Sequence, residues 1–161
     1  MDIQKIYLET TMFSFYHEER TKQGYISLKE DTRKVFDLIK TGKYEAYTST
    51  VTTDEIIKET NLEKRGKMAS LITEFGVKIL VESVEAKRLA ELYLREKVVP
   101  ESEPIDAAHI AITTANGIDF IVSLNFEHIV RPWTIERVRR INLQHGYKPI
   151  GIYKPAEVLV L

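Results

Sequence analysis

Four side chains with oxygen donors stand where this sequence could carry out chemistry: Glu9, Glu55, Asp106 and Asn125. Their oxygens are hard ligands that suit Mg²⁺ or Mn²⁺. Carboxylates that lie close together also need a cation to remain ionised. A bound divalent cation can activate water and neutralise charge on a phosphodiester. The chemistry expected of these residues is therefore metal-assisted hydrolysis.

Strand-like and helix-like segments alternate along the whole chain. Short β-rich runs predict strands at residues 3–8, 45–49, 77–81, 119–123 and 150–153. Apolar periodicity and helix stop signals predict helices at residues 28–40, from 52 onward, 63–74, 84–97, 104–116 and 134–144. This alternation is typical of a parallel sheet with helices on both faces. Because there is no internal repeat and no flexible linker, residues 1–161 are expected to form one domain.

The predicted fold brings the four side chains to one edge of the sheet. Parallel strands share a carboxyl-terminal edge, the crossover helices begin there, and ligands bind there. Glu9 ends the first strand and Asn125 follows the fourth. Glu55 and Asp106 fall in the first turns of the helices that follow the second strand and precede the fourth. The position of Asp106 requires that residues 98–103 return the chain to this edge.

Each of these residues also has an ordinary structural interpretation. Thr52-x-x-Glu55 matches a capping box, and Asp106 would interact favourably with a helix dipole. Glu9 would be a solvated loop residue, and Asn125 a turn residue. These interpretations account for each residue alone but not for their shared edge. We therefore expect an acidic pocket.

Three segments around these residues resemble the PIN-domain family. They are residues 6–11 (IYLETT), residues 50–56 (TVTTDEI), and residues 106–111 (DAAHIA) together with 117–125 (GIDFIVSLN). The resemblance covers nearly the whole chain in element order, and it is strongest to the VapC-type toxin ribonucleases of type II toxin–antitoxin systems. It implies a PIN-like three-layer α/β/α sandwich with a central, mainly parallel sheet of four to five strands.

The resemblance also implies a site and an activity. Glu9, Glu55 and Asp106 would hold Mg²⁺ (or Mn²⁺) for the cleavage of RNA. Asn125 would occupy the place of the family's fourth, variable acid. The hydroxyl groups that would orient the acids or a water molecule belong to Thr10 and Ser123.

Two further side chains are candidates for contact with the substrate. His109 lies nearly one helical turn after Asp106, so it could reach the pocket or a phosphate. A packed structural histidine is the alternative interpretation. Arg131 opens an arginine-rich segment that could bind RNA phosphates, and a solvated helix face is the alternative there.

Two departures from the family pattern keep a second function open. Glu9 stands where the family usually has aspartate, and Asn125 removes a negative charge. The alternative function is a catalytically weak or inactive PIN-like module that binds RNA or protein. A nucleotide-binding or phosphoryl-transfer protein fits less well, because the chain has neither GxxxxGK[ST] nor GxGxxG.

Composition narrows the class of protein. The absence of cysteine excludes a disulfide scaffold, a thiolate zinc site and a cysteine nucleophile, and it is typical of a reducing cytosol. No apolar run approaches the roughly 18 residues of a membrane span. The net charge of −1 indicates that contact with nucleic acid is local. We expect a cytoplasmic protein; the resemblance adds RNA as the substrate, a homodimer and a separate antitoxin protein.

Overall fold

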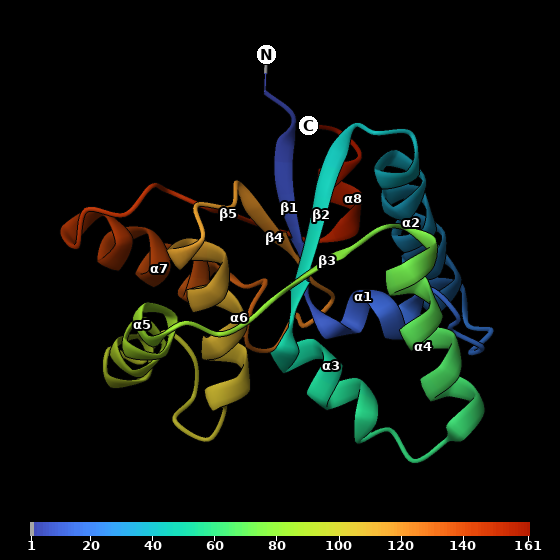
Figure 1. The fold of residues 1–161 in the computed structure, drawn as a ribbon, viewed down its shortest axis with the longest axis horizontal. Helices are drawn as coiled ribbons and strands as arrows, with labels where there is room; N and C mark the ends of the chain where they lie inside the picture. The colour runs from blue at the N-terminus through green and yellow to red at the C-terminus, as the bar shows by residue number, and fades with distance from the viewer. Residues whose placement is uncertain (1) are drawn as a thin grey trace.

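Five parallel strands form the central sheet, in the order β3-β2-β1-β4-β5 (Figure 1). The structure, a computed structural model, describes residues 2–161. The strands are β1 Gln4–Leu8, β2 Tyr44–Ser49, β3 Lys78–Leu80, β4 Phe120–Val122 and β5 Gly151–Tyr153. Neighbouring strands all pair in parallel, as the alternation of strands and helices predicts. The predicted three-layer α/β/α sandwich is confirmed.

Helices cover both faces of the sheet. Within residues 2–161 they are α1 Thr10–Phe15, α2 Gln23–Lys40, α3 Thr50–Ile57, α4 Leu62–Glu74, α5 Val84–Arg95, α6 Pro104–Ala115, α7 Pro132–Gln144 and α8 Pro155–Val158. Helices α1, α2, α4 and α8 pack on one face, and α5, α6 and α7 pack on the other (Figure 1). Along β1, Ile6 and Leu8 enter the first core and Tyr7 the second, because successive side chains point to opposite faces. None of the helices described is both long and apolar enough to cross a membrane.

Two short helices, α1 and α8, are absent from the sequence-based prediction. Helix α1 buries Met12 and Phe13, and the ring of Phe13 lies edge-on to Phe36 of α2 at 5.9 Å between centroids. A six-residue helix is too short to show periodicity or to be stable alone, so tertiary packing stabilises it. The start of α2 was also predicted too late: it begins at Gln23 rather than at residue 28, because its first turn is largely exposed and carries no apolar pattern.

The start of α3 corrects the predicted position of Glu55. Ser49 is the N-cap of this helix, and its side chain accepts a hydrogen bond from the backbone N–H of Val51. Glu55 therefore lies in the second turn, and the prediction that it lies in the first turn is wrong. The predicted capping box is wrong for the same reason, because Thr52 lies buried inside the helix and Ser49 occupies the capping position.

The connection between α5 and α6 returns the chain to the carboxyl-terminal edge. Lys97 adopts a positive φ of 55° just after α5, and Val98 is fully buried. The Val98 carbonyl accepts a hydrogen bond from the Thr134 hydroxyl at 2.8 Å, which ties the connection to α7. Helix α6 then begins at Pro104, so Asp106 lies in its first turn, as the sequence predicts.

Candidate active site

Glu9 lies at the junction of β1 and α1 and has 3% of its surface exposed. Its Oε1 accepts hydrogen bonds from Thr11 Oγ1 at 2.5 Å and from Ser123 Oγ at 2.6 Å. Its Oε2 accepts none from residues 2–161, yet no buried side-chain oxygen in this range lacks a partner. Oε2 therefore has access to solvent. Glu9 presents one oxygen fixed by hydroxyl groups and one that is available to a ligand.

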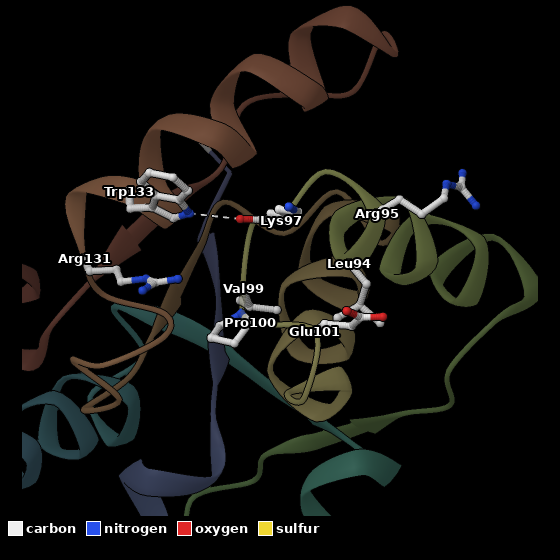
Figure 2. A pocket seen from close by; sticks show the side chains of 8 residues that line it. All are labelled: Leu94, Arg95, Lys97, Val99, Pro100, Glu101, Arg131 and Trp133. Atoms are coloured by element: carbon white, nitrogen blue, oxygen red, sulfur yellow. Dashed lines mark hydrogen bonds between the residues drawn. The ribbon is translucent and has the colours of Figure 1, made fainter.

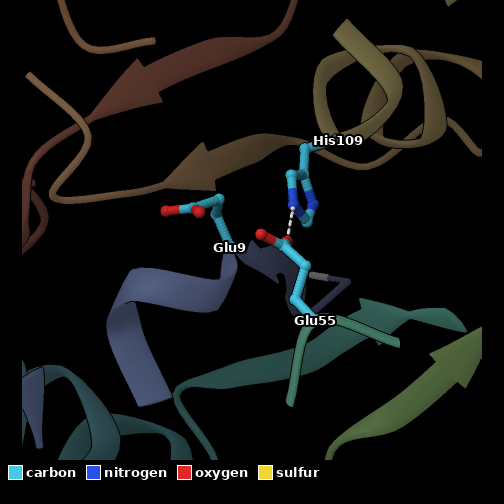
Figure 3. Close-up of side chains that lie close together, drawn as sticks. All are labelled: Glu9, Glu55 and His109. Carbon is cyan, nitrogen blue, oxygen red and sulfur yellow. Dashed lines mark hydrogen bonds and ion pairs between the residues drawn. The ribbon is translucent and has the colours of Figure 1, made fainter. Parts of the chain in front are cut away.

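Glu55 approaches the same place from α3, opposite His109 of α6 (Figure 3). Its Oε1 accepts a hydrogen bond from Thr10 Oγ1 at 2.5 Å and lies 2.8 Å from Nε2 of His109. His109 is fully buried, and its Nδ1 lies 2.7 Å from the Tyr7 hydroxyl. That hydroxyl lies 2.7 Å from Oγ of Ser49. A continuous row of hydrogen bonds thus runs from the interior of the sheet to Glu55.

Asp106 is held by the loop that follows β4. Its Oδ1 accepts a hydrogen bond from Nδ2 of Asn125 at 3.2 Å, and its Oδ2 lies 3.1 Å from Nδ1 of His128. The side-chain oxygen of Asn125 in turn accepts from the His128 backbone N–H at 3.0 Å. Asn125 therefore orients Asp106 through its amide nitrogen.

Ser123 connects these two parts of the site. Its Oγ donates to Glu9 and accepts from the backbone N–H of Asn125 at 2.9 Å. The position of Ser123 is set by the pairing of β1 with β4, which places Leu8 beside Val122. The residues that follow the two strands are therefore neighbours, and the three carboxylates share one edge of the sheet.

The electrostatics of the carboxylates differ. Burial, assisted by the charge of Glu9, raises the pKa of Asp106 above its ordinary value. Burial alone would also raise the pKa of Glu55, but the hydrogen bonds and charge of His109, assisted by Thr10, lower it. The ionised form of Asp106 would therefore be stabilised by a nearby cation.

The pKa of His109 has opposing causes. Burial alone would lower it, but the Tyr7 hydroxyl, the hydrogen bond to Glu55 and the charge of Glu9 together raise it to about 10. His109 is therefore protonated at neutral pH. Nε2 of His109 already contacts Glu55 and Nδ1 contacts Tyr7, so neither ring nitrogen is free to bind a metal ion.

The remaining donors suit a hard divalent cation. Ligand atoms of Glu9, Glu55 and His109 lie within 4.8 Å of one another, and those of Glu103, Asp106 and His128 form a second group of the same kind. With His109 excluded, the first group leaves one carboxylate oxygen each from Glu9 and Glu55. Carboxylate oxygens are ligands that Mg²⁺ and Mn²⁺ prefer. The donor set therefore fits these ions.

The other predicted site residues take different places. Thr10 and Ser123 each donate a hydrogen bond to a carboxylate, so both orient acids. His109 has no exposed surface, so it reaches Glu55 and does not face the surface where a substrate would bind. Arg131 lines a separate pocket beside the acidic edge.

Four side chains that contact this site were not among the predicted site residues: Tyr7, Thr11, Ser49 and His128. Thr11 and Ser49 lie near the ends of predicted strands, which is the signal that could have identified them. A tyrosine inside a buried strand is indistinguishable from an ordinary core residue. His128 lies three positions after Asn125, and its contact with Asp106 depends on how the loop after β4 folds.

Comparison with known proteins supports the fold. Neither a protein-family model nor a curated protein matches the sequence. Among solved structures, VapBC2 from Rickettsia felis, determined with a DNA fragment from its promoter, is similar over 94% of this chain and 98% of the matched chain. The TM-score is 0.52 and the sequence identity is 10%. The protein thus has a PIN-like α/β fold that it shares with the matched VapBC2 chain.

Proposed function

We propose that this chain is a Mg²⁺-dependent endoribonuclease that hydrolyses RNA phosphodiester bonds. One observation carries the proposal: Glu9 and Glu55 come from different elements, and each has one oxygen fixed by neighbours and the other unbonded within residues 2–161. Their ligand atoms lie within 4.8 Å of each other, and the single charge of His109 offsets only one of the two carboxylates, so a bound divalent cation would stabilise the pair. Their arrangement is therefore that of a preorganised cation site.

The proposed roles follow from the contacts. Glu9, Glu55 and Asp106 would hold Mg²⁺ (or Mn²⁺), which supplies an activated water and neutralises phosphodiester charge when bound. His109 is a positioning residue, because it contacts Glu55 and has no exposed surface. Asn125 positions Asp106, since its amide donates to that carboxylate.

The test is cleavage of a labelled single-stranded RNA with Mg²⁺, with Mn²⁺ and with a chelator. We expect cleavage with either metal and none with the chelator. Calorimetry should show metal binding under the same conditions. Absence of both cleavage and metal binding at millimolar metal would support the alternative function, a PIN-like module that binds RNA or protein without cutting.

The amide of Asn125 provides a prediction about metal affinity. Asn125→Asp places a carboxylate oxygen about 3 Å from Oδ1 of Asp106, where Nδ2 lies now. Without metal, we expect the two charges to repel and to destabilise the fold by about 1 kcal/mol. With Mg²⁺, the added ligand should strengthen binding roughly tenfold. Thermal unfolding with and without metal measures both effects, and equal changes in melting temperature under both conditions would contradict the prediction.

We also propose a toxin–antitoxin setting in the cytoplasm, with a separate antitoxin protein as partner and a homodimer as the assembly. Support comes from the similarity of fold to VapBC2. A short upstream reading frame that encodes a DNA-binding amino-terminal region would support the partner. Light scattering on the purified chain tests the dimer.

A further inference from the structure

A pocket of about 800 Å³ lies between the end of α5, the connection that follows it and the start of α7 (Figure 2). Its lining includes three cationic side chains, Arg95, Lys97 and Arg131, and one anionic side chain, Glu101. Trp133 also lines the pocket, and the remaining lining residues are apolar. The pocket therefore combines net positive charge with an aromatic surface, in a protein whose total charge is −1.

Trp133 is a fixed aromatic surface. The residue is 50% exposed, although burial of an indole ring is favourable. Its Nε1 donates to the carbonyl of Lys97 at 2.9 Å, and the guanidinium of Arg137 lies 3.6 Å from its ring centre. The ring is therefore held in place before any ligand arrives. A preorganised ring loses little entropy when a planar group stacks on it.

Arg131 is fixed in a similar way. Its Nε donates to the Thr134 hydroxyl at 2.8 Å, and Thr134 is fully buried. Its two Nη atoms donate to no acceptor within residues 2–161, and Figure 2 shows the side chain extending toward Val99 and Pro100. A guanidinium held at one nitrogen with two others available is suited to bind a phosphate group with two hydrogen bonds.

The pocket adjoins the acidic edge through two short segments. Arg131 follows His128 by three residues, and His128 contacts Asp106. On the other side, Glu101 precedes Pro104, the first residue of the helix that carries Asp106. Short stretches of chain therefore join the lining of the pocket to residues of the acidic edge on both sides.

We propose that this pocket binds a nucleotide of single-stranded RNA, with its base stacked on Trp133 and its phosphate bound by Arg131. The location beside the scissile bond rests on the proposed nuclease function, whereas the binding itself does not. A single strand is specified because the bases of a duplex are already stacked and cannot cover the indole ring. An acidic peptide would bind through the cationic side chains alone and would leave the exposed indole ring without a role. The aromatic surface therefore favours a nucleotide.

Trp133 is the single tryptophan of the chain, so its fluorescence reports on the pocket alone. Single-stranded RNA of about 12 nucleotides would be titrated in EDTA, which separates binding from cleavage. We expect saturable quenching of the fluorescence. In a parallel anisotropy experiment with labelled RNA, Trp133→Ala should weaken binding roughly 5- to 50-fold, while Trp133→Phe, which keeps a stacking ring, should stay within about threefold.

Matched charge variants give the second measurement. Arg131→Ala should weaken RNA binding roughly tenfold and reduce its salt dependence. Arg65→Ala removes the same charge from α4, on the opposite face of the sheet, and should have little effect. Circular dichroism would verify that each variant is folded.

Three results would overturn the proposal: anisotropy that shows binding without quenching, equal losses in the Arg131 and Arg65 variants, or equal quenching by an acidic peptide. Failure of the proposed nuclease function can be distinguished from failure of the proposed nucleotide pocket. Quenching without cleavage would support the pocket and oppose the nuclease. Cleavage by Trp133→Ala with an unchanged KM, together with no quenching of the wild-type protein by RNA, would support the nuclease and oppose the pocket.

Discussion

Asp106→Asn is expected to reduce metal-dependent RNA cleavage by roughly 100-fold or more, while the protein remains folded. A metal ion contributes several kcal/mol of charge stabilisation to phosphodiester hydrolysis, and removing one of its anionic ligands forfeits much of that. Asn125 and His128 already surround the carboxylate, and asparagine has the same shape. The measurement is the initial rate of cleavage with saturating Mg²⁺.

Stability distinguishes a lost ligand from a damaged fold. Burial and the charge of Glu9 raise the pKa of Asp106, so its ionised form is disfavoured in the folded protein at neutral pH. In EDTA, the neutral variant should therefore unfold at the same or a higher temperature than the wild type. With Mg²⁺, the wild type should gain more stability, because it binds the metal more tightly. Cleavage at the wild-type rate by a folded Asp106→Asn protein would show that Asp106 is outside the active site.

His109→Leu is expected to destabilise the protein and to impair the site at the same time. The variant leaves the half-buried carboxylate of Glu55 without its charged partner and removes one contact of the buried Tyr7 hydroxyl. Loss of one member of a fully buried pair costs roughly 3–5 kcal/mol. Because the Glu55 side chain is 30% exposed, we expect about 2 kcal/mol here. Thermal unfolding should show a decrease of roughly 4–8 °C.

His109→Gln is the matched control. Its amide N–H can reach Glu55 from a position similar to Nε2, so part of the stability and part of the metal affinity should return. If His109 contributed only packing volume, glutamine and leucine at this position would lower stability equally. Neither substitution would then change metal binding measured by calorimetry. An unchanged melting temperature in His109→Leu would show that Glu55 does not depend on this histidine.

The arrangement of layers was predictable from the sequence because it depends on local patterns. Alternating strand and helix segments require parallel crossovers, and parallel strands require coverage on both faces. The shared edge of Glu9, Asp106 and Asn125 follows from the same rule, since each stands at a strand end or a helix start. Short helices such as α1 were not predictable, because their stability comes from contacts with α2 and α4.

The detailed geometry at the acidic edge was decided by tertiary structure. The sequence placed an acid, Glu55, and a histidine, His109, near one edge, but their contact joins residues 54 positions apart. The contact of His109 with Tyr7 joins residues 102 positions apart. Such pairs depend on how α3 and α6 pack against β1, which no local pattern encodes. The sequence by itself determined that the acids lie along one edge of the sheet. Packing decided that Glu9 groups with Glu55 and Asp106 with His128, and which oxygens remain available to a ligand.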